Sequence, residues 1–292
     1  MRKSVRKIVG PLKEAALVVD RRMPVSVRRR VRYLVRHHRL LHLRNPRTFT
    51  EKVQWRTVHD RRDLIAFTCD KLAMKEHALQ AGLSELRVPR TYWAGTDLRE
   101  LTGVDLPERW VLKPNHRFGL VHLGSGAPDV DRLVATTRGW LDEVRSLRGE
   151  WAYSQARRCF VVEEMIGTEP PDDFKFFVFE GEPRLVQYST DRFSTGHRAR
   201  LYTPDWRPAG GTGYQMPDVI APPARLDEML SVASTLGKPF DFIRVDLYDV
   251  DGATWFGELT PYPGSGLRRF DPRELDEQLG AAWTLPRGEG IR

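Results

Sequence analysis

The sequence predicts an α+β protein whose helices come before and between the strands of antiparallel sheets. Apolar residues recur at helical spacing through much of residues 25–82, and short strand-like runs follow Gly82. Turn formers such as Gly181 and Asp251-Gly252 separate most of these runs. The chain has 292 residues, 40% of them hydrophobic, which is enough for two domains with a real core.

The N-terminal arm, residues 1–44, is strongly basic. It carries 14 Lys and Arg against Glu14 and Asp20, although the whole chain has a net charge of only +8. Within the arm, residues 25–43 are predicted to form an amphipathic helix with an apolar stripe of Val27, Val31, Leu34, Val35 and Leu41. One interpretation packs this stripe on the body. The other places the arm on an anionic polymer or a membrane surface. Nucleic acid is disfavoured, because no aromatic residues are interleaved with the arginines.

The remaining elements follow from periodicity and caps. Residues 49–82 are predicted to be helical, with Thr48 or Thr50 as the N-cap of the first helix and a second helix over 63–79. Strands are expected at residues 87–93, 110–114, 160–166, 174–179, 183–189, 241–248 and 254–260. Further helices are expected at residues 131–147, 224–236 and 272–283.

Two carboxylates near the C-terminus carry the strongest chemical signal. Strand side chains alternate between faces, so Arg244, Asp246 and Tyr248 share one face of their strand. Glu258 and Thr260 share a face of the next strand. Charged groups in the middle of a domain must be solvated, paired or bound to a metal. Acids on adjacent strands are typical of a Mg²⁺ site that also holds substrate phosphates.

The length of the connecting loop decides whether the two acids meet. A three-residue loop over 251–253, with Gly252 in a bulge, pairs Asp246 with Glu258. A two-residue turn would instead pair Val245 with Glu258, place the acids on opposite faces and rule out a shared metal. We predict the three-residue loop. The alternative is an exposed hairpin whose charges face solvent.

Lysines are informative because the chain has few of them. Lys113 ends a predicted strand, Lys175 lies in another strand on the same face as Asp173, and Lys71 stands near a helix start. Taken singly, each fits a surface position. Together with paired carboxylates, lysines projecting from sheets are typical of a nucleotide site, where cations neutralise phosphate oxygens.

Several other classes are excluded or disfavoured. The GxxxxGK[ST], GxGxxG and GxSxG patterns are absent, which argues against a P-loop NTPase, a dinucleotide-binding dehydrogenase and an α/β-hydrolase. His38 and His42 have helical spacing but no evident third metal ligand. Cys69 and Cys159 are too few for a disulfide framework or a cysteine zinc site. With no readable secretory signal, the expected location is the cytoplasm, and an arm bound to lipid would make the protein peripheral to the inner membrane face.

Eight motifs in order resemble the TupA-like ATP-grasp family, named for teichuronopeptide biosynthesis. The resemblance runs from about Asn45 to Trp283. The motifs are residues 45–52 (NPRTFTEK), 70–71 (DK), 88–89 (VP), 111–116 (VLKPNH), 163–164 (EE), 173–176 (DFKF), 244–248 (RVDLY) and 256–260 (FGELT). The resemblance implies an ATP-grasp fold, in which two α+β subdomains clasp ATP between antiparallel sheets. It divides the chain into a basic helical arm (1–44), a helical region (45–85), a small subdomain (86–165) and a C-terminal subdomain (166–292).

The resemblance also implies roles for individual residues. Lys71 and Lys113 would contact ATP phosphates. Glu163, Glu164 and Met165 would lie on the hinge strand, whose backbone reads the adenine edge. Asp173 would lie near the ribose, and Lys175 near the terminal phosphates. Asp246, Glu258 and Thr260 would ligate Mg²⁺, and Arg244 would stabilise the phosphorylated intermediate.

This sequence departs from the family pattern in two places. The loop after the phosphate lysine is usually glycine-rich, but Arg117 and Phe118 replace its small residues here. The charge of Arg117 can compensate for lost phosphate-binding amides. The third metal ligand is Thr260 rather than the common asparagine, so it is expected to act as a weaker ligand or through water.

The substrate side is predicted from the glycines and arginines around the second carboxylate strand. Gly264, Ser265 and Gly266 can expose backbone amides as a nest for an oxyanion or a carboxylate, although a simple turn explains the same residues. Arg192 and Arg268 are candidates for binding an acidic substrate.

The implied function is an ATP-dependent carboxylate–amine ligase that forms an amide through an acyl phosphate and releases ADP and phosphate. Its substrates would be a small carboxylate, such as an amino acid, and an amine acceptor. Its pathway would build a natural product or a cell-surface polymer. The alternatives are a phosphotransferase, an ester-forming ligase, a glycosyltransferase-linked polysaccharide enzyme or a degenerate nucleotide-binding module.

Overall fold

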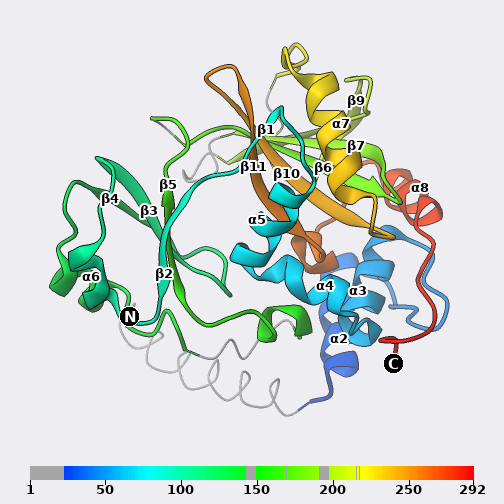
Figure 1. Cartoon of the computed structure of the whole chain (residues 1–292). Coiled ribbons are helices and arrows are strands. Elements are labelled where there is room, and N and C mark those ends of the chain that lie inside the picture. Colours follow the sequence, from blue (N-terminus) through cyan, green and yellow to red (C-terminus); the bar gives the residue numbers. More distant parts are fainter. Residues whose placement is uncertain (1–22, 143–148, 169, 191–196, 215, 217) are drawn as a thin grey trace, which may run out of the picture.

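The computed structural model describes residues 23–142, 149–168, 170–190, 197–214, 216 and 218–292. Two sheets dominate these residues, and Figure 1 shows them side by side with helices α2, α3 and α4 grouped below the larger one. The larger sheet has seven strands in the order β1-β11-β10-β6-β7-β8-β9, and the smaller has four in the order β2-β5-β3-β4. The α+β class and the antiparallel sheets are confirmed.

The strands of the smaller sheet come from the middle of the chain. They are β2 (Thr91–Gly95), β3 (Arg109–Pro114), β4 (His122–Ser125) and β5 (Phe160–Glu164). Those of the larger sheet are β1 (Leu86–Arg87), β6 (Asp173–Phe179), β7 (Glu182–Thr190), β8 (Arg198–Tyr202), β9 (Pro208–Gly210), β10 (Ile243–Val250) and β11 (Ala253–Thr260). β1 pairs with β11, so it belongs to the larger sheet although the predicted domain boundary assigns it to the small subdomain.

The described helices are shorter than the sequence predicts. They are α2 (Val25–His37), α3 (Phe49–His59), α4 (Asp63–Ala66), α5 (Lys71–Gln80), α6 (Val130–Thr136), α7 (Leu226–Gly237) and α8 (Glu274–Ala282). The 3-10 turns are η1 (Phe67–Cys69), η2 (Leu98–Gly103), η3 (Trp151–Ser154) and η4 (Pro263–Gly266). None of the described helices is long and apolar enough to cross a membrane.

Some predicted elements are wrong in extent. The helix predicted over 25–43 ends at His37, because His38 adopts a left-handed conformation that closes the helix. The helix predicted over 131–147 ends at Thr136, and residues 143–148 lie outside the described part of the chain. The strand predicted over 87–93 is split in two by residues 88–90. Strands β4, β8 and β9 were not predicted.

The β10–β11 hairpin corrects the predicted loop. Val250 pairs with Ala253, so the turn is the two residues Asp251-Gly252, and both have positive φ as a type I′ turn requires. The ladder then shifts by one residue, because Leu247 faces Phe256 while Asp246 faces Glu258. Gly257 is the extra residue of this bulge. The predicted three-residue loop is wrong, yet Asp246 and Glu258 are paired as predicted, since the bulge supplies the odd residue inside the ladder.

The larger sheet buries both of its faces. On one face, Val178 of β6 contacts α7, where an added Cβ at Gly237 would lie 2.4 Å from the valine side chain. On the other face, Phe177 and Phe179 pack against Phe49 at the start of α3, with ring centroids 5.6 and 6.1 Å apart. This second face is apolar at the Phe179 end of β6 and charged at the Asp173 end.

The chain enters α3 through a capping box that fixes Phe49. Thr48 accepts a hydrogen bond from the Glu51 amide, and the Glu51 carboxylate accepts one from the Thr48 amide at 3.2 Å. Thr48 is thus the N-cap, one of the two predicted candidates. Phe49 is 1% exposed and joins the core cluster at the centre of the molecule.

The arm helix α2 packs on the body with the face opposite to the one predicted. Arg29, Tyr33 and His37 are buried, whereas the four helical members of the predicted stripe are exposed. Its fifth member, Leu41, lies past the helix end and is buried. The side chains of Val31 and Val35 are 50% and 69% exposed. The interpretation that the helix packs on the body through its Val/Leu stripe is therefore wrong. The buried arginine, described below, explains the inversion.

Replacing Phe49 with alanine should lower the free energy of unfolding by about 3–5 kcal/mol, because it removes a fully buried ring and leaves a cavity. Urea unfolding followed by circular dichroism measures this. Leu79→Ala is the matched control, since Leu79 is 65% exposed and should change the value by no more than about 0.5 kcal/mol. Equal effects of the two substitutions would contradict the assignment of Phe49 to the core.

Candidate active site

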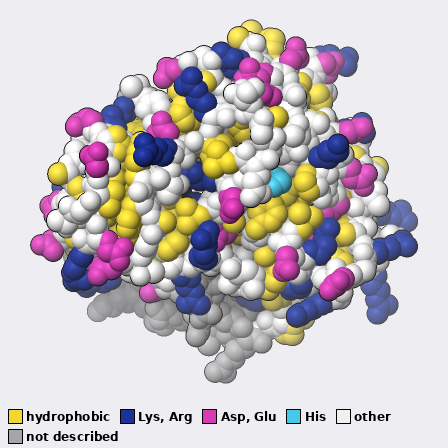
Figure 2. All heavy atoms as spheres, in the orientation of Figure 1, with side chains coloured by type: hydrophobic (Ala, Val, Ile, Leu, Met, Phe, Trp, Pro, Cys, Tyr) yellow, Lys and Arg dark blue, Asp and Glu magenta, His cyan; other side chains and the backbone are white. Residues whose placement is uncertain are grey.

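A cleft of about 520 Å³ lies between the two sheets. Residues from both sheets and from α5 line it, including Lys71, Lys75, Lys113, Glu163 and Glu258. Figure 2 shows basic and hydrophobic side chains together around a hollow on this face of the molecule. Four of the residues predicted for nucleotide and metal binding therefore meet in one cavity.

The predicted catalytic and metal residues form two rows across adjacent strands. Asp246 faces Lys175 of β6 on one side and Glu258 of β11 on the other. One step along the same face, Arg244 faces Thr260. Strand alternation places Arg244 and Asp246 on the same face, and register brings the other residues beside them. Backbone pairing between the strands thereby brings together side chains that are far apart in the sequence.

Arg244 joins the members of this cluster. Its Nε donates to Asp246 Oδ1 at 2.6 Å and its Nη2 to Asp246 Oδ2 at 2.7 Å, a bidentate pair. The same Nη2 donates to Glu258 Oε1 at 3.1 Å and to Thr260 Oγ1 at 3.0 Å. Arg244 is thus held by all three predicted metal ligands.

Lys175 pairs with the other side of Asp246. Its Nζ lies 2.8 Å from Asp173 Oδ2 and 3.4 Å from Asp246 Oδ2. Burial raises the pKa of the Asp246 carboxyl, and the charges of Arg244 and Lys175 oppose that rise. Asp173, predicted near a ribose, is buried as the partner of Lys175.

The oxygen atoms of Asp246, Glu258 and Thr260 suit a hard divalent cation only when substrate phosphates and water supply the remaining ligands. Among the described residues, no group of three or more His, Cys, Asp or Glu side chains is placed to hold a metal. Asp246 and Glu258 supply carboxylates, and Thr260 donates its hydroxyl hydrogen to Glu258 Oε1 at 3.0 Å. Mg²⁺ is commonly held by one or two carboxylates together with water and substrate phosphates. These residues fit such a site.

On the opposite wall of the cleft, Glu163 pairs with two lysines. Lys113 of β3 forms an ion pair with Glu163 Oε1, and Lys75 of α5 lies 3.2 Å from Glu163 Oε2. Burial disfavours the Glu163 charge, but the two ammonium groups lower the pKa of this carboxyl below its ordinary value. Lys75 also donates to Thr91 Oγ1 at 2.7 Å. Sequence reasoning missed Lys75, although it follows Lys71 by four residues and so shares its helix face.

Lys71 is partly buried at the first turn of α5. Asp70 caps that helix by accepting hydrogen bonds from the amides of Leu72 and Ala73. The Lys71 ammonium donates to the carbonyls of Asn115 and Arg117, on the loop that follows Lys113. Burial, and then the charge of Lys113, lower the pKa of Lys71 to about 8. Two phosphate-binding candidates from separate elements thus stand near each other in the cleft.

Other predicted residues lie at the margin of the cleft. Glu164 points to the opposite face of β5 and accepts a hydrogen bond from the Arg90 amide at 3.0 Å. Met165 follows the end of β5 and is partly buried. Arg268 donates to the Tyr214 hydroxyl at 2.9 Å and lines a narrow cavity that also contains Arg244 and Gly264. Arg192 lies outside the described residues.

The 264–266 loop is a tight turn whose carbonyls are held from behind. The Ser265 amide donates to the Tyr262 carbonyl at 2.8 Å, which leaves the predicted nest without that amide. Gln54 donates to the carbonyls of Ser265 and Gly266 at 2.8 and 2.7 Å. Arg29, which is 1% exposed, also donates to the Ser265 carbonyl. Neither Arg29 nor Gln54 was predicted to contact this loop.

A model of the TupA-like ATP-grasp family matches residues 51–284. The chain belongs to the TupA-like ATP-grasp family. No curated protein matches the chain.

Solved structures of ATP-grasp ligases are similar to this TupA-like chain at low identity. D-alanine–D-alanine ligase from Bacillus anthracis, complexed with ATP, is 16% identical, with a TM-score of 0.42 over 67% of this chain and 55% of that one. L-amino acid ligase from Bacillus licheniformis is 16% identical, with a TM-score of 0.43 over 74% and 46%. The ligase PsnB, with a precursor variant, Mg and ADP, is 13% identical, with a TM-score of 0.41 over 77% and 62%. The chain thus spans about half to two thirds of their lengths.

One departure of this TupA-like chain from its family pattern has a structural explanation. Arg117 donates to the carbonyls of Gly139 and Trp140, at 2.9 and 3.4 Å. The guanidinium that was expected to compensate for lost glycines therefore anchors the loop to the α6 region. Its neighbour Phe118 contacts Tyr153, with ring centroids 5.5 Å apart.

Glu163→Gln should destabilise the protein at neutral pH and leave it almost unchanged in acid. The folded-state pKa of Glu163 is lowered, so its stabilisation is present above the unfolded-state value of 4.5 and is lost as the pH falls through the folded-state value. Urea unfolding of both proteins between neutral and acidic pH measures the difference. The control, Glu182→Gln at a side chain 65% exposed, should follow the parent protein throughout. A difference from the parent that did not shrink in acid would contradict the ion-pair assignment.

Proposed function

We propose that the chain is an ATP-dependent carboxylate–amine ligase that forms an amide through an acyl phosphate and releases ADP and phosphate. The observation that carries this proposal is the cluster of Lys175, Arg244, Asp246 and Glu258 on one sheet face. It adjoins a cleft that contains further lysines. Membership of the ATP-grasp family supports ATP as the nucleotide. The cytoplasm, where ATP and free thiols such as Cys69 occur, is the proposed location.

In this proposal Lys71 and Lys113 neutralise the ATP phosphates from two sides of the cleft. Lys71 extends from the first turn of α5, and Lys113 comes from β3 of the smaller sheet. Such cations stabilise the charge that develops during phosphoryl transfer. Glu163 holds Lys113 in place until the nucleotide offers its own negative charge. The backbone around Glu164 and Met165 is the proposed contact to the adenine edge, and Asp173 is the proposed contact near the ribose.

Asp246 and Glu258, with Thr260 beside them, would hold Mg²⁺, which would neutralise phosphate oxygens when bound. In the structure Arg244 donates hydrogen bonds to the carboxylates of both Asp246 and Glu258. If these oxygens held a cation, they would no longer be available to the guanidinium. The released Arg244 can then bind the substrate carboxylate and later the oxyanion of the tetrahedral intermediate. Lys175 balances the charge of Asp246 and faces the terminal phosphate.

The substrates proposed are a small carboxylate, such as an amino acid, and an amine acceptor. Arg244 and Arg268 line the same narrow cavity, next to Gly264. Two guanidinium groups beside a turn are suited to a carboxylate. The acceptor is proposed to belong to natural-product or cell-surface polymer synthesis.

Release of ADP should require both ATP and the correct acid, with hydroxylamine serving as a surrogate amine. Incubation with Mg²⁺, ATP and pooled amino acids should yield ADP together with a hydroxamate, because an acyl phosphate reacts with hydroxylamine. Asp246→Asn and Glu258→Gln should each lower turnover by about a thousandfold or more, since each removes a cation ligand. Glu182→Gln, far from the cluster, should retain activity.

Each alternative function gives a different product in this assay. AMP in place of ADP would indicate adenylation and overturn the proposed chemistry. ADP with a stable phosphorylated product and no hydroxamate would indicate a phosphotransferase. Nucleotide-induced thermal stabilisation without turnover, whatever the acid and amine, would indicate a binding module.

Nucleotide affinity should fall as the pH rises through the pKa of Lys71. That pKa is about 8 because Lys71 is partly buried near Lys113, so the ammonium is charged at pH 7 and mostly neutral at pH 9. A non-hydrolysable ATP analogue should bind up to about tenfold more weakly at the higher pH. Lys71→Arg should remove most of this pH dependence and keep the affinity, whereas Lys71→Gln should bind weakly at both values. If Lys71→Gln bound the analogue with the same affinity and the same pH dependence as the parent protein, a contact between Lys71 and phosphate would be contradicted.

A further inference from the structure

The outward face of α2 is apolar and exposed among the described residues. Val27, Val31, Leu34 and Val35 are 38%, 50%, 45% and 69% exposed, and Leu40, just past the helix end, is 68% exposed. With 3.6 residues per turn, these valines and Leu34 form one stripe, and the buried Arg29, Tyr33 and His37 lie on roughly the opposite side. We call the exposed set, Val27, Val31, Leu34, Val35 and Leu40, the arm stripe.

Polar contacts on the buried side lock the helix in this orientation. Arg29 bonds to Gln54 and to the Ser265 carbonyl, and the Tyr33 hydroxyl lies 3.1 Å from Thr50 Oγ1. Arg36 donates to the Leu267 carbonyl at 3.0 Å. Rotation of the helix to bury the stripe would strand the Arg29 guanidinium and these carbonyls. The exposure of the arm stripe is therefore a property of the fold.

Arginines flank the arm stripe without any acidic residue. Residues 24–44 contain seven arginines and no Asp or Glu. On the helix, Arg30 borders one side of the stripe, and Arg28 and Arg32 border the other. Figure 2 shows basic side chains along the lower right of this face, near α2.

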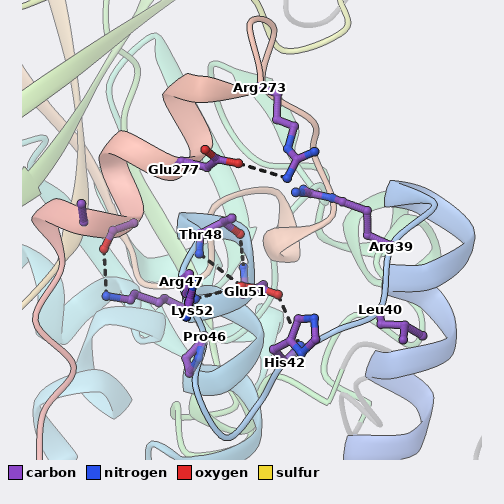
Figure 3. A pocket seen from close by; sticks show the side chains of 12 residues that line it. Arg39, Leu40, His42, Pro46, Arg47, Thr48, Glu51, Lys52, Arg273 and Glu277 are labelled. Atoms are coloured by element: carbon purple, nitrogen blue, oxygen red, sulfur yellow. Dashed lines mark hydrogen bonds and ion pairs between the residues drawn. The ribbon is translucent and has the colours of Figure 1, made fainter.

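Two hollows adjoin the helix, and arginines outnumber acids in the lining of each. One, of about 650 Å³, is lined by Arg30, Arg44 and Arg47, and the other, of about 890 Å³, by Arg39, Arg47 and Arg273 together with Glu277. Arg273 forms an ion pair with Glu277 at 3.0 Å, and Arg39 one with Asp276 at 3.4 Å. Figure 3 shows the guanidinium groups of Arg39 and Arg273 close together at the edge of the larger hollow. Glu51, between the hollows, directs its carboxylate to the amides of His42, Arg47 and Thr48. The hollows can accept the phosphate groups of lipid heads.

We propose that α2 and residues 38–47 dock the protein on an anionic phospholipid bilayer. The arm stripe would enter the boundary between headgroups and acyl chains, and the flanking arginines and the two hollows would contact lipid phosphates. An exposed apolar stripe bordered by arginines is the pattern of a helix that lies in the plane of a membrane surface. This inference does not depend on the proposed ligase activity.

Charge argues against the other occupants of this surface. A second copy would bring two arginine-bordered stripes together, which is unfavourable. Residues 1–22 carry seven Lys and Arg against Glu14 and Asp20, so their charge repels α2 and adds to the attraction toward anionic lipid. A soluble polyanion accounts for the arginines and leaves the arm stripe without a partner.

The test compares binding of the full chain to phosphatidylcholine vesicles with and without phosphatidylglycerol, measured by co-sedimentation. We expect binding only when the anionic lipid is present, and less of it at high salt. Val31→Ser combined with Val35→Ser should weaken binding about tenfold, because it removes apolar contact and keeps every charge. Leu79→Ser, at a similarly exposed position on α5, is the matched control and should bind like the parent.

Several outcomes would overturn the proposal. They are absence of binding to anionic vesicles, equal binding by the double serine variant, and vesicle binding that appears only after residues 1–22 are deleted. Poly-glutamate that bound the parent while vesicles did not would instead identify a polymer site. Self-association lost in the double variant, without vesicle binding, would identify a dimer surface. As an independent readout, Val35→Trp should give a blue shift in fluorescence on anionic vesicles, and its absence would contradict insertion.

Discussion

A fully buried carboxylate needs a cation beside it, and this requirement organises the active-site face of the larger sheet. Asp246 is completely buried and contacts Arg244 and Lys175. On the facing wall Glu163 is held by Lys75 and Lys113. Removing one partner from such a pair leaves an uncompensated charge in a poorly solvated place. Most of the charged groups proposed to contact ATP or Mg²⁺ are therefore engaged by a protein group of opposite charge, namely Lys113, Lys175, Asp246 and Glu258. Lys71 instead donates to two backbone carbonyls.

In the proposed function, ligand binding is an exchange of partners. A phosphate that approaches Lys113 competes with Glu163, and a cation that approaches Asp246 competes with Arg244. The exchange conserves the number of charge pairs, so the site can open without leaving a buried ion alone. It also couples the two walls of the cleft. Arg244 becomes available for a carboxylate only when the acids have another partner, which favours binding of nucleotide and metal before the acid substrate.

The same constraint explains the basic arm. Arg29 is buried, and it finds its acceptors in Gln54 and in the Ser265 carbonyl. Those contacts select which face of α2 meets the body, and the arm stripe remains outside as a result. Helix α2 consequently supports the 264–266 loop from behind. A membrane surface that binds the outer face of α2 would therefore contact a helix that holds this loop in place.

Side-chain alternation made much of the site predictable. Arg244 with Asp246, and Glu258 with Thr260, share faces because strands alternate, and the motifs pointed to the family model that matches residues 51–284. The pairing of Asp246 with Glu258 was predicted correctly but for the wrong structural reason. The extra residue is Gly257, in a bulge inside the ladder, and not a third residue of the loop. A glycine in mid-strand is the available signal for a bulge, and here it was not used.

What the sequence could not show depends on long-range contacts. The spacing of valines and leucines in α2 indicates an apolar face but cannot indicate that a single arginine on the other face has a buried acceptor over 200 residues away. Strand β8 was missed because it is only five residues long, although its arginines alternate with the buried Ala199 and Leu201 as in a half-buried strand. Lys75 was not singled out from the sequence, because its partner Glu163 is brought to it by β5. For Arg29 and Lys75 the decisive partner is a polar group supplied by a distant element, and the pattern of one segment carries no record of it. Local periodicity can therefore predict which face of an element is apolar, whereas the pairing of its buried charges decides which face turns inward.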